Sequence, residues 1–541
     1  MKQLIANRIF VCLTAFILTA VMISCGGEKP KLGPNDYDVV VVGSGGGGLS
    51  AAARLAKKGM KVLVIEQHYQ VGGFMSSFER KGYRFEASLH AMDYTGVAMF
   101  EKLGIKDKVK VVEINPAYIA SFPGLELEVP VDVKEYIKRL KALFPKESDG
   151  IDKLVDNMWS IQVTMQNLMN LQDKKDVVSS IASLIFKPWN LWPVIKYWSK
   201  NNTEMMHDFV KDEKLIGIFT QLMCYSGVPS DNVSGMLFAM MWNSYHFGGF
   251  YYFHGGSHAI TKACAEVVQE NGGTVLLSHL VTKINIKDGK AVSVIAQDKR
   301  TNELKEFKCR YVVSNANAPD TFFKLVGREY LPADYVKRIE TGKIGLSPFG
   351  IYLGVNYDYS NALPNHNHTV FVNPTFDQGE IFKYYKEGTS EKCQFALVNY
   401  TMIDPTNAPK GKNAIEIISI MPYDYKGDWD MSKGYNAYKA LKEKVAWDFI
   451  RRIEKWYPGI SKHIEVLEVG TPRTMERYTL NPKGTIFGWE YTIDQSMFKR
   501  LPHNTPIENL FLAGAWTFPG GGQSTVLISG VMCSDLILSE E

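Results

Sequence analysis

The chain has 541 residues, of which 45% are hydrophobic and 22% are charged. This composition is typical of a globular protein and excludes an intrinsically disordered chain, and the length is sufficient for two or three domains. The 61 basic and 57 acidic residues give a net charge of +4, which is close to neutral and carries no signature of nucleic-acid binding.

Residues 1–25 predict a signal peptide. Lys2 and Arg8 precede an apolar run over residues 9–23, which is shorter than the roughly 20 residues that a membrane-spanning helix needs. The segment before Cys25 resembles a bacterial lipoprotein cleavage site, so Cys25 is expected to become a lipidated N-terminus. An uncleaved anchor helix and an endoplasmic-reticulum signal are the alternatives, and all three place the protein beside a membrane on its non-cytoplasmic side. Residues 26–36 form a polar tether.

The segment from residue 38 to residue 66 predicts a buried strand, a glycine turn, a helix and a second strand that ends in an acid. Gly43 permits the tight turn, Gly45 lets the backbone approach a pyrophosphate, and Gly48 lets the helix pack on the strand. The helix N-terminus offers unpaired N–H groups to phosphates, and Glu66 can accept a hydrogen bond from a ribose hydroxyl. The segment therefore predicts a dinucleotide site.

Gly72 and Gly73 follow the acidic residue closely. This pair resembles the paired-glycine signature of FAD-binding oxidoreductases, in which backbone lies against the ribose and pyrophosphate. Dehydrogenases that bind only NAD do not usually carry it, so FAD is the expected cofactor.

Two later blocks carry further cofactor-type signals. The first holds a helix after Ser257, a hairpin turn at Asp288–Gly289 and a strand that ends near Asn315. The second holds a short strand ending at Gly514, a turn through Gly522 and a helix over residues 524–538. A helix N-terminus at the flavin would stabilise negative charge on its reduced form by about 0.3–2 kcal/mol.

These blocks predict a cofactor domain assembled from separate segments. The expected fold is α/β, with a discontinuous Rossmann-type FAD-binding domain (residues 37–95, 251–328 and 465–541) and an α+β substrate or lid domain (residues 96–250 and 329–464). Residues 154–200 and 236–253 are rich in Met, Trp and other aromatic residues. They indicate either an apolar substrate tunnel with a membrane-facing entrance or an ordinary aromatic core. The five cysteines beyond the signal are dispersed and indicate neither a disulfide framework nor a metal site.

Taken together, the blocks resemble the carotenoid desaturase, carotenoid isomerase and all-trans-retinol saturase family of FAD-dependent oxidoreductases. The more specific stretches are residues 82–90, where Glu86 and Ser88 replace the family's Asp and Gly, residues 252–257, residues 313–316, residues 478–490 and residues 513–532. The resemblance implies a phytoene desaturase-like and flavin amine oxidase-like fold, and Val281 is implied to contact the adenine side of FAD through its backbone. The implied reaction is desaturation, saturation or isomerisation of a long apolar polyene, a carotenoid or retinoid, with an electron partner that the sequence does not identify.

His90 and Glu490 lie within these motifs and are the candidate catalytic acid or base, because a near-neutral His or a Glu with a raised pKa suits proton transfer. Each residue has an alternative role as a brace for the flavin or a loop. Two other functions stay open. One is an amine-oxidase-like flavoenzyme, and the other is a non-redox lipid carrier of the Rab GDP-dissociation inhibitor type.

Overall fold

The computed structural model describes residues 33, 36–88, 91–172, 181 and 188–541. The predicted signal peptide, nearly all of the tether and the catalytic candidate His90 lie outside these residues. Among the helices in the described ranges, none combines the length and the apolar character needed to cross a membrane.

The first seven-stranded sheet joins segments that are far apart in the chain. Its strand order is β10-β2-β1-β13-β12-β11, and β19 pairs with β13. The bounds are β1 Tyr37–Val42, β2 Val62–Ile65, β10 Thr274–Leu276, β11 His279–Lys287, β12 Lys290–Asp298, β13 Leu304–Ser314 and β19 Leu510–Leu512. The central pairs β1–β2, β1–β13, β2–β10 and β13–β19 are parallel, whereas β11, β12 and the first half of β13 form an antiparallel meander.

The run of valines in β1 is explained by burial on both faces of this sheet. Val39 and Val41 belong to the main hydrophobic core, and Val40 and Val42 belong to a second core on the opposite face. A strand covered on both sides needs apolar residues at every position rather than at alternate ones.

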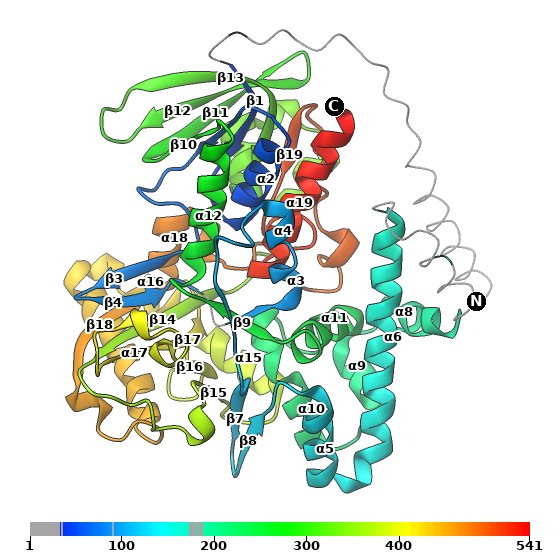
Figure 1. Cartoon of the computed structure of the whole chain (residues 1–541), viewed down its shortest axis with the longest axis vertical. Coiled ribbons are helices and arrows are strands. Elements are labelled where there is room, and N and C mark those ends of the chain that lie inside the picture. The colour runs from blue at the N-terminus through cyan, green and yellow to red at the C-terminus, as the bar shows by residue number, and fades with distance from the viewer. Residues whose placement is uncertain (1–32, 34–35, 89–90, 173–180, 182–187) are drawn as a thin grey trace.

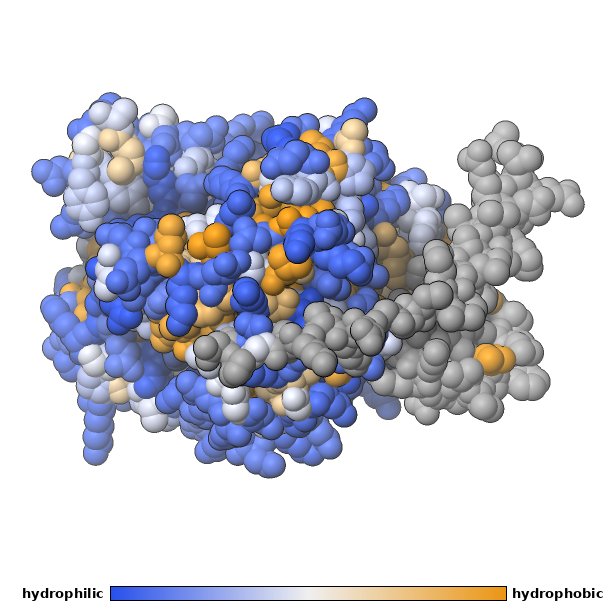
Figure 2. All heavy atoms as spheres, turned by 90° about the horizontal axis from the view of Figure 1, so that it is seen from above, coloured by the Kyte–Doolittle hydropathy of each residue, from blue (hydrophilic) through white to orange (hydrophobic). Residues whose placement is uncertain are grey.

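Three helices pack around the parallel strands at the top of Figure 1, namely α2 Gly46–Lys57, α12 Ser257–Glu270 and α19 Gln523–Glu540. The hairpin between β11 and β12 turns at Asp288 and Gly289, which both have positive φ angles, so the predicted turn is confirmed. Seen from this end in Figure 2, hydrophilic residues form most of the rim, and hydrophobic residues show between them across the middle of the face.

The second seven-stranded sheet has the order β18-β14-β17-β16-β15-β7-β8 and is antiparallel except for the pair β15–β7. Its strands are β7 Tyr118–Phe122, β8 Leu125–Val129, β14 Ser347–Val355, β15 Thr369–Val372, β16 Phe395–Asn399, β17 Asn413–Met421 and β18 Ile464–Gly470. Around it lie α15 Gln378–Glu387, α16 Tyr425–Trp429, α17 Tyr435–Ile453 and α18 Pro472–Thr479. Helix α14 Ala333–Glu340 instead packs through Ile339 into the second core, on the first sheet.

A group of helices lies beside this sheet, at the lower right of Figure 1. It consists of α5 Val133–Leu143, α6 Ser148–Gln172, α8 Leu191–Tyr197, α9 Asn202–His207, α10 Glu213–Phe219 and α11 Gly235–His246. Small elements connect the parts: β3 Ser77–Arg80, β4 Tyr83–Glu86, β5 Met92–Asp93, β6 Val111–Glu113, β9 Phe250–Phe253, α3 Tyr94–Val97, α4 Phe100–Leu103 and α13 Ala318–Asp320. The predicted class, α/β with an α+β part, is confirmed.

Candidate active site

A continuous cavity of about 810 Å³ runs from the first sheet into the space between the second sheet and the helices. One part, the glycine cradle, is lined by Gly43, Gly45, Gly47, Gly72 and Gly73. The other part, the apolar chamber, is lined by Met165, Leu237, Met240, Met241, Phe371 and Ile420. The cavity therefore joins a pocket lined by backbone to a pocket lined by apolar side chains.

The glycine cradle needs residues without a side chain. Gly43 has a φ of +90°, a conformation that other residues rarely adopt, and its N–H donates to Ile65 at 2.8 Å. A Cβ at Gly47 would lie 2.6 Å from the backbone of Gly514, and a Cβ at Gly48 would lie 2.3 Å from the carbonyl oxygen of Gly43. Gly48 thus packs α2 against β1 and does not line the cavity.

Glu66 ends β2 at the rim of the cradle and is only 7% exposed. Its carboxylate accepts hydrogen bonds from the N–H and hydroxyl of Ser44 at 2.8 and 2.7 Å and from the N–H of His68 at 2.8 Å. These donors fix the carboxylate in place at the end of the strand, and an ionised carboxylate has further lone pairs for a ribose hydroxyl.

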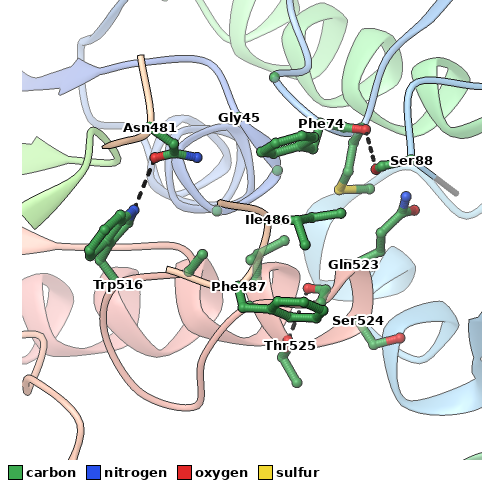
Figure 3. Close-up of a pocket in the computed structure, with 18 of the residues that line it drawn as sticks. Gly45, Phe74, Ser88, Asn481, Ile486, Phe487, Trp516, Gln523, Ser524 and Thr525 are labelled. Carbon is green, nitrogen blue, oxygen red and sulfur yellow. Dashed lines mark hydrogen bonds between the residues drawn. The ribbon is translucent and has the colours of Figure 1, made fainter. Parts of the chain in front are cut away.

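The C-terminal turn closes the other side of the cradle. Gly520 and Gly522 both have positive φ angles, and α19 begins after Gly522 without a side-chain cap. The amide nitrogen and oxygen of Gln523 are buried without hydrogen-bond partners, so they are free for a ligand. Figure 3 shows Ser524 and Thr525 of this first turn below Phe74 and Ile486, with the side chain of Gln523 to the right of Ile486.

The remaining cofactor candidates lie around the same space. Val281 and Asn315 line the cavity, whereas Gly514 lies just behind its wall, where its N–H donates to the Ser529 hydroxyl at 2.9 Å. A flat, phosphate-bearing dinucleotide fits this set, because uncapped helix N-termini, side-chain-free backbone and a fixed acid are what it requires.

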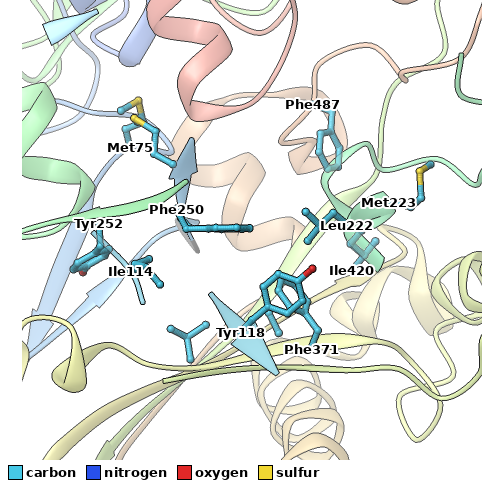
Figure 4. Close-up of a cluster of buried hydrophobic side chains, with 14 of the residues drawn as sticks. Met75, Ile114, Tyr118, Leu222, Met223, Phe250, Tyr252, Phe371, Ile420 and Phe487 are labelled. Atoms are coloured by element: carbon cyan, nitrogen blue, oxygen red, sulfur yellow. The ribbon is translucent and has the colours of Figure 1, made fainter. Parts of the chain in front are cut away.

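The apolar chamber is lined by side chains from the helix group and from the second sheet. Met165 comes from α6, Met240 and Met241 from α11, and Phe371 from β15. Figure 4 shows Met75, Phe371, Ile420 and Phe487, all of which line the cavity, among further buried aromatic and aliphatic side chains. An apolar ligand of some length fits such a wall, because burying each CH₂ group contributes about 0.8 kcal/mol.

Of the two catalytic candidates, only Glu490 is described. Its N–H donates to the carbonyl oxygen of Lys343 at 2.8 Å, and its side chain does not belong to the described wall of the cavity. Burial raises the pKa of the Glu490 carboxyl, and Lys386 and Lys343 oppose that rise. A direct proton transfer to a ligand in the chamber is not favoured by this position, so the role of Glu490 stays a prediction.

Two residues that the sequence did not single out are prominent in the structure. Asp93 lies in the cavity wall and is 7% exposed. Arg500 is buried beneath the C-terminal turn, where its guanidinium donates to the carbonyl oxygens of Phe487, Trp489 and Ala515 at 2.6, 2.9 and 3.1 Å. Neither residue belongs to a recognisable motif, and the position of each depends on contacts with residues that only folding brings near.

Comparisons with known proteins agree with this geometry. The chain is 28% identical over 546 residues to prolycopene isomerase 1 of an Oncidium hybrid cultivar, which covers 97% of this chain and 87% of the relative. It is 26% identical over 533 residues to human all-trans-retinol 13,14-reductase, covering 93% and 86%. These relatives confirm the resemblance to carotenoid isomerases and retinol saturases.

An oxidoreductase from Methanosarcina mazei shares the fold, with a TM-score of 0.59 at 18% identity over 93% of this chain and all of the other. The model of the flavin containing amine oxidoreductase family matches residues 47–326, which is more than half of the chain. FAD, the predicted cofactor, is thereby confirmed, and the protein is an FAD-dependent oxidoreductase that belongs to the flavin containing amine oxidoreductase family.

Proposed function

We propose that the protein transfers hydride at carbon–carbon single or double bonds of a long apolar polyene, a carotenoid or a retinoid. The observation that carries this proposal is the single cavity that leads from the glycine cradle into the apolar chamber. The relatives named for prolycopene isomerisation and retinol reduction support the same substrate class.

The flavin, when bound, supplies the electron pair of the reaction. In this proposal the protein positions both partners. Gly43, Gly45, Gly72, Gly73 and Glu66 hold the cofactor, with Gly48 and Gly514 packing behind them and Val281, Asn315 and Gly522 completing the site. The chamber orients the polyene and excludes water. Residues 37–95, 251–328 and 465–541 form the proposed cofactor domain, and residues 96–250 and 329–464 the proposed substrate domain.

The test is an absorption spectrum of the purified protein lacking residues 1–25, followed by anaerobic incubation with a panel of carotenoids and retinoids. We expect flavin bands that bleach or return with one polyene, which also gives the direction of the reaction. A colourless protein that binds polyene would contradict the enzyme assignment and would indicate a lipid carrier. A bound flavin that responds to amines and to no polyene would contradict the proposed substrate class and would indicate an amine oxidase.

We further propose that the protein works at a membrane surface. Exposed aromatic and aliphatic side chains gather on the helices beside the cavity: Trp159, Trp189, Trp192, Ile195 and Trp198. Trp198 stacks on Phe498, which stacks in turn on Phe518 in the cavity wall, at ring-centroid distances of 6.0 and 5.3 Å. Tryptophan favours the boundary between lipid and water, so this line of rings supports a substrate path from a bilayer.

The proposed anchor is the N-terminal segment, with lipidation of Cys25 at the cell envelope. Vesicle flotation separates the two contributions. The protein lacking residues 1–25 is expected to float with lipid vesicles, and its Trp189→Ser/Trp192→Ser variant is expected to remain in solution. Equal flotation of both proteins would show that Trp189 and Trp192 do not contribute to membrane binding. Mass spectrometry of the full-length protein tests the lipid on Cys25 separately.

A further inference from the structure

Asp93 lies where the two parts of the cavity meet. It ends β5, lines the cavity, and has Ser244 of α11 on one side and Ser524 of α19 on the other. Because α11 contributes Met240 and Met241 to the apolar chamber and α19 begins at the cradle, the Asp93 carboxyl lies between the cofactor side and the substrate side.

The two oxygens of this carboxyl have different surroundings. Oδ1 accepts hydrogen bonds from the N–H of Thr95 at 2.7 Å and from the Thr95 hydroxyl, which is how Asp93 caps the short helix α3. Oδ2 lies 3.4 Å from the Ser244 hydroxyl, which is a long hydrogen bond. One oxygen therefore has a structural task, and the other is only weakly held.

The carboxyl also has no charged partner, because no ion pair of Asp93 occurs within the described chain. Burial raises the pKa of Asp93, and the hydrogen bonds from the N–H and hydroxyl of Thr95 only partly oppose that rise. A carboxyl in an apolar wall without a cation favours its neutral form, which is able to give up a proton.

We propose that Asp93 is the catalytic acid that protonates the polyene during reduction of a carbon–carbon double bond. The proposal rests on the proposed function. The proton leaves Oδ2 and forms a C–H bond at one carbon of the double bond, while the neighbouring carbon receives the electron pair and second hydrogen as hydride from reduced flavin. The π bond is lost, and the Asp93 carboxylate is reprotonated from solvent once the product has left the chamber.

The competing role for Asp93 is only to cap α3. The substitution Asp93→Asn separates the two, because an amide oxygen at the Oδ1 position still accepts from Thr95 but the amide carries no acidic proton. Asp132→Asn is the matched control. Asp132 caps α5 by accepting from the N–H of Lys134 at 2.8 Å, and it is absent from the described wall of the cavity.

The experiment uses the FAD-loaded protein lacking residues 1–25, reduced chemically and mixed with the polyene that responds in the absorption panel. In Asp93→Asn we expect the single-turnover rate to fall roughly 100-fold or more, with polyene affinity and flavin content within threefold of the parent protein. Asp132→Asn is expected to match the parent. In the parent the rate should fall as pH rises through the pKa of Asp93, and this limb should be missing in Asp93→Asn.

A second readout does not depend on turnover. The infrared difference spectrum on polyene binding to the oxidised parent is expected to show a protonated carboxyl band that is lost in Asp93→Asn and shifted in Ser524→Ala. The shift keeps the test usable if Asp93→Asn fails to fold. A parent-like rate in Asp93→Asn, or no such band, overturns the role of Asp93. A parent protein that reduces none of the polyenes overturns the proposed function instead, while the infrared band still reports the protonation of Asp93.

Discussion

The backbone N–H of Glu86 donates a 2.6 Å hydrogen bond to the carboxyl of Glu416, so two buried acidic residues contact each other. The Glu86 carboxyl accepts from the Tyr252 hydroxyl at 2.9 Å and from the Ser257 hydroxyl at 2.6 Å, at the start of α12. Glu416 Oε2 has no partner in the described chain. Glu86 is therefore the residue suited to carry a charge, and Glu416 is held neutral.

This pair predicts that the protein loses stability as pH rises. Burial raises the pKa of Glu86 to about 7 and also raises that of Glu416. A carboxyl with a raised folded-state pKa binds its proton more tightly in the folded protein, so stability falls from about pH 4.5 up to about pH 7 for Glu86. We expect a loss on the order of 1–3 kcal/mol across this window, measured by denaturant unfolding at a series of pH values.

Glu416→Gln keeps an acceptor for the N–H of Glu86 and removes one acid. Its unfolding free energy is expected to vary less with pH than that of the parent, with the difference largest above pH 7. An unchanged pH profile in Glu416→Gln would show that this pair does not set the dependence.

The contact between Gly47 and Gly514 predicts that the cradle does not tolerate alanine. In Gly47→Ala the new methyl group would meet backbone at 2.6 Å, and backbone cannot move aside as a flexible side chain can. We expect about 1–3 kcal/mol of destabilisation and a loss of bound flavin, measured by unfolding and by the flavin absorbance of the purified protein. Gly379→Ala in the first turn of α15 is the control, since the nearest atom to its new methyl is a carboxylate oxygen at 3.2 Å. Full flavin content in Gly47→Ala would argue against a tightly closed cradle.

Arg500 is expected to hold the C-terminal turn in place. Arg500→Met leaves three buried carbonyl oxygens without their donor, so we expect a loss of roughly 2–4 kcal/mol in unfolding free energy and weaker flavin binding. Arg300→Met is the matched control, because Arg300 pairs with Asp298 at the surface with its side chain 70% exposed, and it should change stability by less than about 1 kcal/mol. Equal effects of the two substitutions would contradict a special role for Arg500.

Glu490→Gln is expected to keep a turnover rate within threefold of the parent. The side chain does not belong to the described cavity wall, and the fixed contact of this residue is made by its backbone N–H to Lys343. The measurement is the same single-turnover assay used for Asp93. A large loss of rate with unchanged flavin content would restore Glu490 as a catalytic candidate and would require it to act through a change in the adjoining loop.

The glycine turn, the first helix and the acid at Glu66 were predictable because the residues next to them in sequence form the pattern that identifies them. Gly43, Gly48 and Glu66 need only the local strand–turn–helix–strand order to find their places. The fold class follows from the same order and from the strand and helix patterns of the two later blocks.

Asp93 could not be found in this way. In sequence it is a single acid between Met92 and Tyr94, and its cavity neighbours Ser244 and Ser524 come from α11 and α19. Glu416 is similar, because it interrupts the apolar strand β17 and only the tertiary structure shows that it meets Glu86. A buried polar residue acquires its role from partners that are distant in the chain, and a single sequence does not show which residues these partners are.

Helices α2 and α19 pack on each other, although they are made at very different times during synthesis. The hydroxyl of Ser50 donates to the carbonyl oxygen of Leu527 at 2.7 Å, and a Cβ at Gly530 would lie 2.3 Å from the carbonyl oxygen of Gly47. Ser50 and Leu527 are 477 positions apart in the chain, so α2 leaves the ribosome long before the helix that completes its packing. The flavin pocket is not complete until α19 has been made, so a chain that crosses a membrane before folding would acquire its flavin on the far side.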